Sequence, residues 1–238
     1  MANRQPAGTP RSLRIHQALA KKLGSEILAG KFPPESLFPG EIEHSAVLGV
    51  SRTPYREAIR TLIAKGLLES RPRAGTKVTP RERWNLLDPD ILAWTFSGTP
   101  DEKFIHDLFE LRNLLEPAAA MMAASRRTPA QLQRMTAAIE GMERHDLATA
   151  EGQDADQRFH AEILVAAGNQ ALATLTSSVG AAVRWTTNYK QSKSRNPRNP
   201  LPEHKAVYAE IAAGNPEAAK AAMEELLRLA LNDMAMEL

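Results

Sequence analysis

The sequence predicts a mainly α-helical protein in two parts: an N-terminal winged helix-turn-helix with a small β wing, and a C-terminal antiparallel bundle of about six helices. Three observations predict this fold class. Residues 39–78 read as helix, glycine corner, helix and short hairpin. From Thr99 onward, apolar residues recur at helical spacing between Pro, Gly and Asn punctuation. No alternating strand pattern interrupts that second part.

The chain begins with polar residues 1–10, for which we expect a disordered arm. Residues 11–30 have the spacing of an amphipathic helix, and Gly30 is suited to end it. The winged helix-turn-helix is expected to occupy residues 11–79, followed by a linker over residues 80–98. Because this linker is rich in apolar residues, including two tryptophans, we expect it to pack on a domain as a short helix.

Two helices joined by a corner form the centre of the N-terminal part. Gly49 supplies the break between them, and Ser51 is placed to cap the second helix through its side-chain oxygen. That helix has an apolar face, whereas Arg52, Thr53 and Arg56 lie on the outer side of its first turns. Arginine at such positions can present a planar fork to guanine in the major groove of DNA.

A basic hairpin follows the second helix. Residues 67–70 and 76–79 read as its strands and residues 71–75 as its turn. Its candidate DNA-contacting residues are Arg71, Arg73, Gly75 and Lys77. The alternative is that these basic groups form only a solvated surface, but a cap, a corner, a basic helix face and a basic wing in one stretch favour DNA binding.

Charge is unevenly distributed along the chain. Residues 1–83 contain 15 Lys and Arg against 7 Asp and Glu, whereas the remainder contains 15 against 21. The first part therefore carries +8 and the second −6. This asymmetry is typical of a nucleic-acid-binding domain attached to a domain with another task.

The C-terminal part, residues 99–238, is divided into helices by clear start signals. Thr99-Pro100-Asp101-Glu102 and Thr128-Pro129-Ala130-Gln131 each read as a capped helix start. Further helices are expected at about 148–167, 170–189, 202–214 and from residue 216 nearly to the end. In the first helix, one apolar stripe is expected at Phe104, Leu108, Leu111, Leu115, Ala118 and Met122.

Several polar side chains are predicted to point into this bundle. Asp156 and His160 are spaced i, i+4 on one helical face, and His204 lies in the first turn of a later helix, above apolar residues. Arg112 lies beside the apolar stripe and needs an anionic partner if it is buried. The alternative is an internal ion-pair cluster of Arg112 with Glu116 and Asp156 with His160.

The composition also limits the class of protein. No cysteine is present, which excludes disulfides, thiolate zinc sites and thiol nucleophiles and suits a reducing cytoplasm. No apolar run approaches the roughly 18 residues of a membrane-spanning helix. The first ten residues lack the apolar core of a signal peptide. We therefore expect a cytoplasmic protein that does not interact with membranes.

The stretch AVLGVSRTPYREAIRTLIAKGLL, continued by RPRAGTKV, resembles the DNA-binding domain of GntR-family bacterial transcription regulators. The resemblance implies that Arg52, Thr53 and Arg56 contact bases and phosphates of a double-stranded operator, and that the wing enters the minor groove. Two positions depart from the family's Leu-Pro-Ser-Glu-Arg-Glu-Leu pattern. Ile42 replaces an arginine that often contacts DNA, and His44 replaces a leucine, which should weaken the packing of the first helix.

The C-terminal part resembles the FCD effector domain of the FadR-type branch of the same family. The matching segments are ELRNLLEPAAAMMAA, DADQRFHAEILVAAGN and EHKAVYAEI. The resemblance implies an effector-binding and dimerisation domain in which a divalent metal helps to bind a small carboxylate. Asp156, His160 and His204 match three metal ligands, and the fourth position falls on Leu226. A three-ligand site can still hold zinc or nickel when water or effector fills the remaining positions.

RERWNLLDPDILAW followed by LRNLLEPAAA is similar to repressors of sugar-acid catabolism. The likeness implies a galactonate-like effector whose carboxylate pairs with Arg112 and whose hydroxyls meet the Asp/His cluster, with Arg184 and Asn188 as further candidates. We therefore predict a homodimeric repressor that binds a palindromic operator. The alternatives are a metal-dependent enzyme with Asp156 or Glu162 as base, and an architectural DNA-binding protein that ignores effectors.

Overall fold

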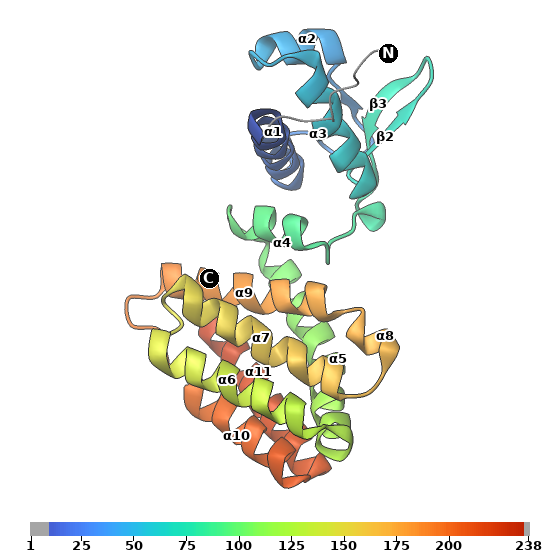
Figure 1. The fold of residues 1–238 in the computed structure, drawn as a ribbon. Coiled ribbons are helices and arrows are strands. Elements are labelled where there is room, and N and C mark those ends of the chain that lie inside the picture. Colours follow the sequence, from blue (N-terminus) through green and yellow to red (C-terminus); the bar gives the residue numbers. More distant parts are fainter. Residues whose placement is uncertain (1–9, 236–238) are drawn as a thin grey trace, which may run out of the picture. The chain divides into compact units, whose positions relative to one another are not determined.

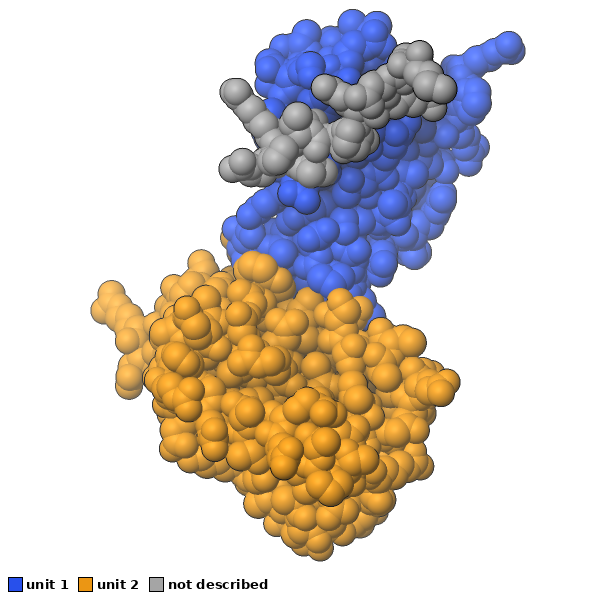
Figure 2. Space-filling model, viewed as in Figure 1, with its two compact units in different colours: residues 1–98 blue, residues 99–238 orange. Residues whose placement is uncertain are grey.

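Two compact units make up the computed structural model, which describes residues 10–235. Unit 1 contains the residues up to Gly98, and unit 2 begins at Thr99 (Figure 2). The arm expected at residues 1–10 lies, apart from Pro10, outside the described residues. Within those residues, no helix is both long and apolar enough to cross a membrane. The structure confirms the mainly α-helical fold class with a small sheet (Figure 1).

Unit 1 is a helix-turn-helix with a wing. Its elements are α1 (Pro10–Leu28), β1 (Leu37–Phe38), α2 (Glu41–Val47), α3 (Arg52–Ala64), β2 (Leu68–Arg71), β3 (Gly75–Val78), a 3₁₀ turn (Arg81–Arg83) and α4 (Pro89–Phe96). The corner between α2 and α3 is formed by Gly49, whose positive φ of 64° a residue with a side chain rarely adopts. Ser51 is the N-cap of α3, but its side chain makes no capping hydrogen bond, which corrects the expected role of its hydroxyl.

The wing contains one more strand than the sequence predicts. β2 and β3 pair antiparallel, with Arg71 opposite Gly75, as expected for the hairpin. In addition, β1 pairs with the other edge of β3, giving the order β1-β3-β2. β1 is only two residues long, and so short a strand leaves no alternating pattern in the sequence.

His44 contributes to the core of unit 1, contrary to the expectation that it would weaken the packing of α2. Its ring is buried among Phe32, Phe38 and Tyr55, with ring centroids 5.5–6.2 Å from its own. Its Nδ1 lies 3.0 Å from the hydroxyl of Tyr55. The hydrogen bond satisfies both polar groups, so the ring fills the position without leaving a buried polar atom unpaired.

The apolar segment after the wing forms the short helix α4, which belongs to unit 1 and packs against α1. Trp94 lies against Gly24 of α1, and Trp84 donates from its indole nitrogen to the carbonyl of Thr79 at 3.1 Å. Both tryptophans are buried in the same core as α1 and α3. Asp88 caps α4 by accepting from the backbone N–H groups of Asp90 and Ile91.

Unit 2 is a bundle of helices (Figure 1). Its elements are α5 (Glu102–Arg126), α6 (Pro129–His145), α7 (Ala150–Ala166), α8 (Gln170–Ala173), α9 (Thr176–Lys193), α10 (Leu201–Ala213) and α11 (Pro216–Ala235). The helix expected at 170–189 is therefore two helices, α8 and α9. Neighbouring pairs in the bundle include α5 with α11, α6 with α7 and α7 with α9.

In unit 2, the start of α6 follows the sequence signals, whereas the start of α5 departs from them. Thr128 forms the predicted capping box with Gln131 at the start of α6. α5, however, begins two residues later than expected, because Asp101 rather than Thr99 is its N-cap and accepts from the N–H of Lys103.

The buried face of α5 also differs from the predicted stripe. Phe104 and Leu108 are buried, but the later stripe positions Leu111, Leu115, Ala118 and Met122 are only partly buried. The fully packed face continues instead through Arg112, Glu116, Ala119, Ala120 and Ala123. Two ionisable side chains therefore lie inside the bundle, which positions the site described next.

Candidate functional site

The candidate DNA-contacting residues lie on the exposed surface of unit 1. Arg52, Thr53 and Arg56 are exposed on the first turns of α3, and Ser51 precedes them. Arg71, Arg73, Gly75 and Lys77 are exposed on the wing. Ile42, which stands where the family pattern has an arginine, is 72% exposed, so its side chain contributes nothing to the core.

One carboxylate joins two arginines of this surface. Glu41 Oε1 accepts from Arg52 Nε at 2.6 Å, and Glu41 Oε2 accepts from Arg56 Nε at 2.8 Å. Hydrogen bonds from Arg56 and Arg52 lower the pKa of Glu41, so the carboxylate stays ionised. Both arginines thereby use Nε for Glu41, and no bond of their terminal nitrogens is found in the described residues.

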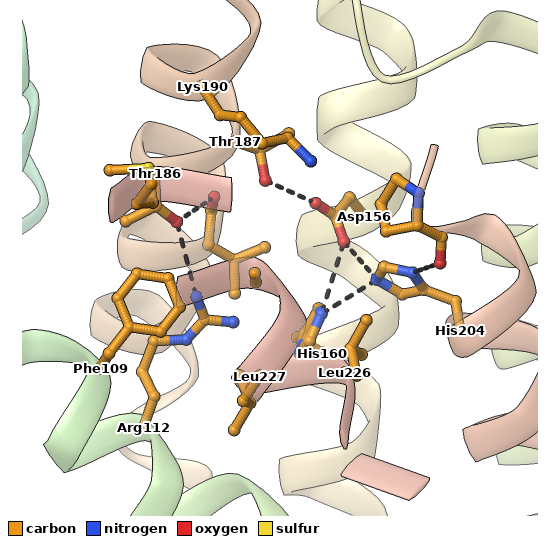
Figure 3. A pocket seen from close by; sticks show the side chains of 14 residues that line it. Phe109, Arg112, Asp156, His160, Thr186, Thr187, Lys190, His204, Leu226 and Leu227 are labelled. Carbon is orange, nitrogen blue, oxygen red and sulfur yellow. Dashed lines mark hydrogen bonds and ion pairs between the residues drawn. The ribbon is translucent and has the colours of Figure 1, made fainter. Parts of the chain in front are cut away.

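The second candidate site is a pocket inside unit 2, with a cavity volume of about 30 Å³ and partly open to solvent (Figure 3). Its polar lining comes from four helices: α5, α7, α9 and the start of α10. The polar side chains are Arg112, Asp156, His160, Thr186, Thr187, Lys190 and His204. α11 closes the pocket with apolar side chains, among them Leu226 and Leu227.

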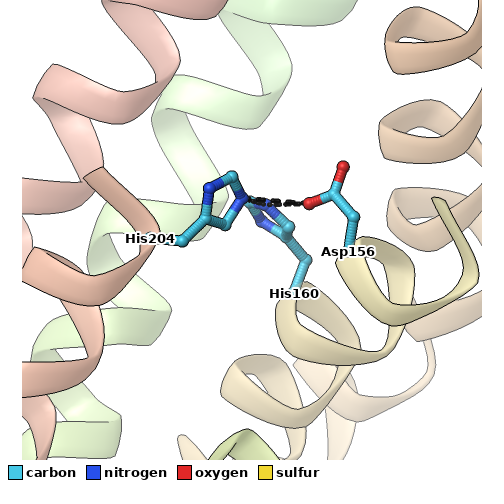
Figure 4. Close-up of side chains that lie close together, drawn as sticks. All are labelled: Asp156, His160 and His204. Carbon is cyan, nitrogen blue, oxygen red and sulfur yellow. Dashed lines mark hydrogen bonds and ion pairs between the residues drawn. The ribbon is translucent and has the colours of Figure 1, made fainter. Parts of the chain in front are cut away.

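Asp156, His160 and His204 converge in this pocket as predicted (Figure 4). All three are buried, and their candidate ligand atoms lie within 4.8 Å of one another. His204 Nε2 is 3.0 Å from Asp156 Oδ1 and 3.3 Å from His160 Nε2. The i, i+4 spacing on α7 places Asp156 and His160 one turn apart, and the first turn of α10 brings His204 opposite.

The remaining ring nitrogens fix the direction in which this cluster points. His204 Nδ1 lies 2.7 Å from the carbonyl oxygen of Pro200, which can only accept, so Nδ1 carries the proton. His160 Nδ1 donates to the carboxylate of Glu116. Both Nε2 atoms and Asp156 Oδ1 therefore face one point, where a proton or a cation must separate their lone pairs.

This donor set fits a divalent metal ion. Imidazole nitrogen and carboxylate oxygen are ordinary ligands of zinc and nickel. Metal-binding histidines usually donate their second N–H to a carboxylate or a carbonyl, as His160 and His204 do here. The fourth family position, Leu226, lines the same pocket and offers no ligand atom.

Arg112 and Glu116 form a buried ion pair beside the histidines. Arg112 Nε donates to Glu116 Oε1 at 2.5 Å, and Nη1 lies 3.5 Å from the hydroxyl of Thr186. Burial would raise the pKa of Glu116, but Arg112 and His160 outweigh it and hold the pKa at about 2. Glu116 therefore stays ionised, and Nη2 of Arg112 finds no partner in the described residues.

The same network determines the protonation of the cluster when no cation is bound. Burial would lower the pKa of His160, yet Glu116 and Asp156 raise it to about 9. Burial likewise opposes ionisation of Asp156, but hydrogen bonds from His160 and His204 lower its pKa. The ion pairs of the alternative interpretation are thus present: Arg112 with Glu116, and Asp156 with His160 at 3.4 Å.

Two predicted effector residues lie outside the pocket. Arg184 forms an ion pair with Asp154, and Asn188 donates to Gln153 Oε1 at 3.3 Å. Neither lines the cavity. α9 instead contributes Thr186, Thr187 and Lys190, which sequence reasoning did not select. Their spacing of i, i+1 and i+4 marks one helical face, and that spacing is the signal that could have identified them.

Comparison with known proteins agrees with this architecture. Residues 15–78 match the family described as bacterial regulatory proteins, gntR family, and residues 107–229 match the FCD domain. The galactonate operon transcriptional repressor of Escherichia coli is 33% identical over 84% of this chain and 88% of its own. YieP, an uncharacterized HTH-type transcriptional regulator of the same organism, is 32% identical over 90% of this chain and 93% of its own.

A solved structure supports the fold. Lar, described as controlling the expression of the Listeria monocytogenes agr system, superposes with a TM-score of 0.65 over 98% of this chain and 99% of its own. At 19% sequence identity, this likeness concerns the fold alone.

Proposed function

The chain belongs to the GntR family of bacterial transcription regulators and carries an FCD domain, and from that premise we propose that it represses an operon of sugar-acid catabolism. A small hydroxylated carboxylate would bind in the pocket of unit 2 and release the DNA. The observation that carries the proposal is the convergence of Arg112 with Asp156, His160 and His204 in one buried pocket. The similarity to a galactonate operon repressor supports the class of ligand.

On the DNA side, two copies of unit 1 in a homodimer would bind a palindromic operator. Arg52, Thr53 and Arg56 would meet bases and phosphates in the major groove, and the basic wing would reach the neighbouring groove. Support comes from the exposure of these residues at the start of α3. Much of the affinity would come from phosphate contacts and would therefore fall steeply with salt.

On the effector side, Arg112 would pair with the ligand carboxylate through its free Nη2, which points toward the middle of the pocket (Figure 3). The hydroxyl of Thr186 donates to the carbonyl of Ala182 at 2.8 Å, which leaves it free to accept a hydrogen bond from the ligand. Zinc or nickel would be held by Asp156, His160 and His204, where its charge would polarise bound carboxylate and hydroxyl oxygens. Glu116 and the carbonyl of Pro200 orient the two imidazoles for this role.

The effector can change DNA affinity only by binding the DNA-competent and DNA-incompetent arrangements differently. Because α4 and α5 are consecutive elements, a change in α5 can reach unit 1 along the chain through α4. α4 is buried against α1 through Trp94, so a displaced α4 would disturb the core of unit 1. This connection makes α4 the proposed route between the units.

The proposal is tested by calorimetric titration of the zinc-loaded chain with galactonate. We expect binding, and at least tenfold weaker binding to Arg112→Met, because the carboxylate loses its charged partner. Arg134→Met is the matched control. Arg134 is exposed on α6, where it pairs with Glu162 of α7. No binding of galactonate or related acids to the unaltered chain would contradict the proposal.

Two other functions can be compared with this one. The relatives and families are transcription regulators rather than enzymes, and Glu162, one candidate base, is paired with Arg134 outside the pocket. An architectural DNA-binding protein would have no use for a buried polar pocket. Operator binding that no sugar acid alters would favour that second class.

A further inference from the structure

Lys190 is the one charged side chain of the pocket lining, among the described residues, for which the proposed function gives no role. It lies on α9, is only 6% exposed, and lines the cavity together with Thr186 and Thr187. In Figure 3 its amine and the guanidinium of Arg112 lie apart, with the two threonine hydroxyls between them. The pocket therefore has two cationic groups along its length rather than one.

The amine of Lys190 has a hydrogen-bond donor to spare. Its Nζ lies 3.2 Å from the carbonyl oxygen of Arg198 and 3.3 Å from Asp233 Oδ2. An ammonium group has three N–H donors. Within the part of the chain that the structure describes, only these two partners are found, so one donor is left for a ligand in the cavity.

The charge of Lys190 is already balanced by protein groups. Asp233 pairs with both Lys190 and Arg198, and Arg198 also pairs with Glu203. This group of four contains two cations and two anions. A ligand carboxylate placed here would add a third, buried anion, which is unfavourable, whereas a neutral hydroxyl oxygen would only accept the spare hydrogen bond.

The rest of the pocket has a different charge. Arg112 is balanced by Glu116, and Asp156, whose Oδ2 accepts from Thr187 at 3.0 Å, contributes one negative charge. A divalent cation held by Asp156, His160 and His204 would leave these groups with one net positive charge. One ligand carboxylate, paired with Arg112, restores neutrality.

We infer that the effector carries a single carboxylate, at the Arg112 end, and an uncharged hydroxyl at the other end of its carbon chain, which Lys190 binds. The ligand class is a polyhydroxy monocarboxylate, distinct from a sugar diacid and from a short hydroxy acid. This inference rests on the proposed function. It makes Lys190 a specificity-determining residue.

Three acids test it by calorimetric titration of the zinc-loaded full chain. Galactonate and galactarate differ only in the terminal group. Galactonate ends in a CH₂OH group, whereas galactarate ends in a second carboxylate. Glycerate keeps a carboxylate and hydroxyls but has three carbons where galactonate has six, so it lacks the far hydroxyl that Lys190 would bind. We expect galactonate to bind at least tenfold tighter than galactarate, a comparison that needs no variant.

Lys190→Met should weaken galactonate binding about tenfold, as expected for the loss of one buried hydrogen bond to a charged donor. It should leave glycerate binding unchanged, which also reports an intact pocket. Lys193→Met is the matched control, since Lys193 is exposed on the same helix and does not line the cavity.

Three results would overturn the inference while leaving the proposed function intact. Galactarate could bind as tightly as galactonate. Lys190→Met could leave galactonate unaffected, or could weaken galactonate and glycerate equally, as a purely structural role would. If the unaltered chain binds none of the three acids, the proposed function fails and this inference fails with it.

Discussion

Leu226 is the residue at which the chain departs from the ligand set that its family resemblance implies. Its side chain is buried and lines the pocket with Asp156, His160 and His204. A metal held there would have three protein ligands and positions open to water or effector. The departure therefore has a direct consequence for metal affinity.

Leu226→His should raise zinc affinity at least tenfold, because it adds an imidazole to an assembled set of three ligands. Competition with a chelator of known affinity measures this. Leu226→Gln, similar in size but a poor zinc ligand, is the control. Equal zinc affinity of the histidine variant and the unaltered chain would show that position 226 lies out of reach of the metal.

His44 gives unit 1 a stability that depends on pH. Burial lowers the pKa of His44 below its ordinary value of 6.5, so the folded state keeps the ring neutral. As pH falls below about 6.5, the unfolded chain takes up a proton that the folded chain resists, and the free energy of unfolding decreases. The stabilisation is present above that pH and is lost as pH falls through the pKa of the folded state.

Urea unfolding between pH 7.5 and 5.5 measures this in a Trp185→Phe background, where the fluorescence comes from Trp84 and Trp94 of unit 1. The midpoint should fall with pH. In His44→Leu the part of the decrease due to His44 should vanish, whereas in His106→Leu, which alters an exposed histidine of α5, it should persist. A pH dependence unchanged in His44→Leu would assign it to other groups.

Single residues of the pocket were predictable to different degrees. The i, i+4 pair Asp156 and His160 and the first-turn His204 follow from helical geometry, and the structure brings them together. Arg184 and Asn188, which the sequence suggests as effector-binding residues, lie outside the pocket lining. One position along a helix rotates a side chain by about 100°, so Asn188 lies against α7 while Thr187 enters the pocket.

Among the elements, α3 and the start of α2 share a feature that the sequence did not reveal. Glu41 binds Arg52 and Arg56 through Nε, and among the residues that the structure describes their terminal nitrogens have no hydrogen-bond partner. Such a carboxylate either orients the arginines for DNA or competes with DNA for them. Orientation lowers the entropy lost on binding, and this is the role that we expect.

Glu41→Gln should therefore weaken specific operator binding severalfold and leave binding to random DNA little changed. Glu43→Gln, an exposed carboxylate of the same helix, is the control for the loss of one negative charge. Anisotropy titrations at fixed salt compare the two variants. Tighter operator binding by Glu41→Gln than by Glu43→Gln would mean that Glu41 competes with DNA instead.

The packing of α4 on α1 depends on Gly24. A Cβ at this position would lie 2.4 Å from two ring carbons of Trp94, which is itself buried. Gly24→Ala should lower the free energy of unfolding of unit 1 by about 1–3 kcal/mol, the usual cost of overpacking. Gly40→Ala is the control, because its Cβ would meet no atom within 4 Å. Equal stability of both variants in urea unfolding would contradict this packing.

Elements with a full set of local signals were predictable. The capping box of Thr128, the corner at Gly49 and the hairpin of the wing all appear in the structure. The two-residue β1 was not predictable, because its pairing with β3 depends on tertiary contacts. The buried face of α5 differs from the predicted stripe because Arg112 and Glu116 neutralise each other inside the bundle, whereas sequence patterns place charges outside.

For the whole molecule, we propose that a DNA-binding unit and an effector pocket act together in one chain. Neither site alone makes a ligand-responsive repressor, because regulation requires that the effector distinguish two arrangements of the protein. A typical coupling of 1–3 kcal/mol would change DNA affinity by roughly 5- to 150-fold. That range is easily measured.

The most direct test is fluorescence anisotropy of labelled DNA from upstream of the gene, titrated with zinc-loaded protein at fixed salt, with and without galactonate. We expect tight binding to this DNA, weaker binding to random DNA, and at least fivefold loss of affinity when the acid is present. Arg112→Met should bind the DNA normally and ignore the acid. Tight DNA binding that is unaffected by galactonate and by related polyhydroxy monocarboxylates would contradict the claim that the pocket controls the DNA-binding unit.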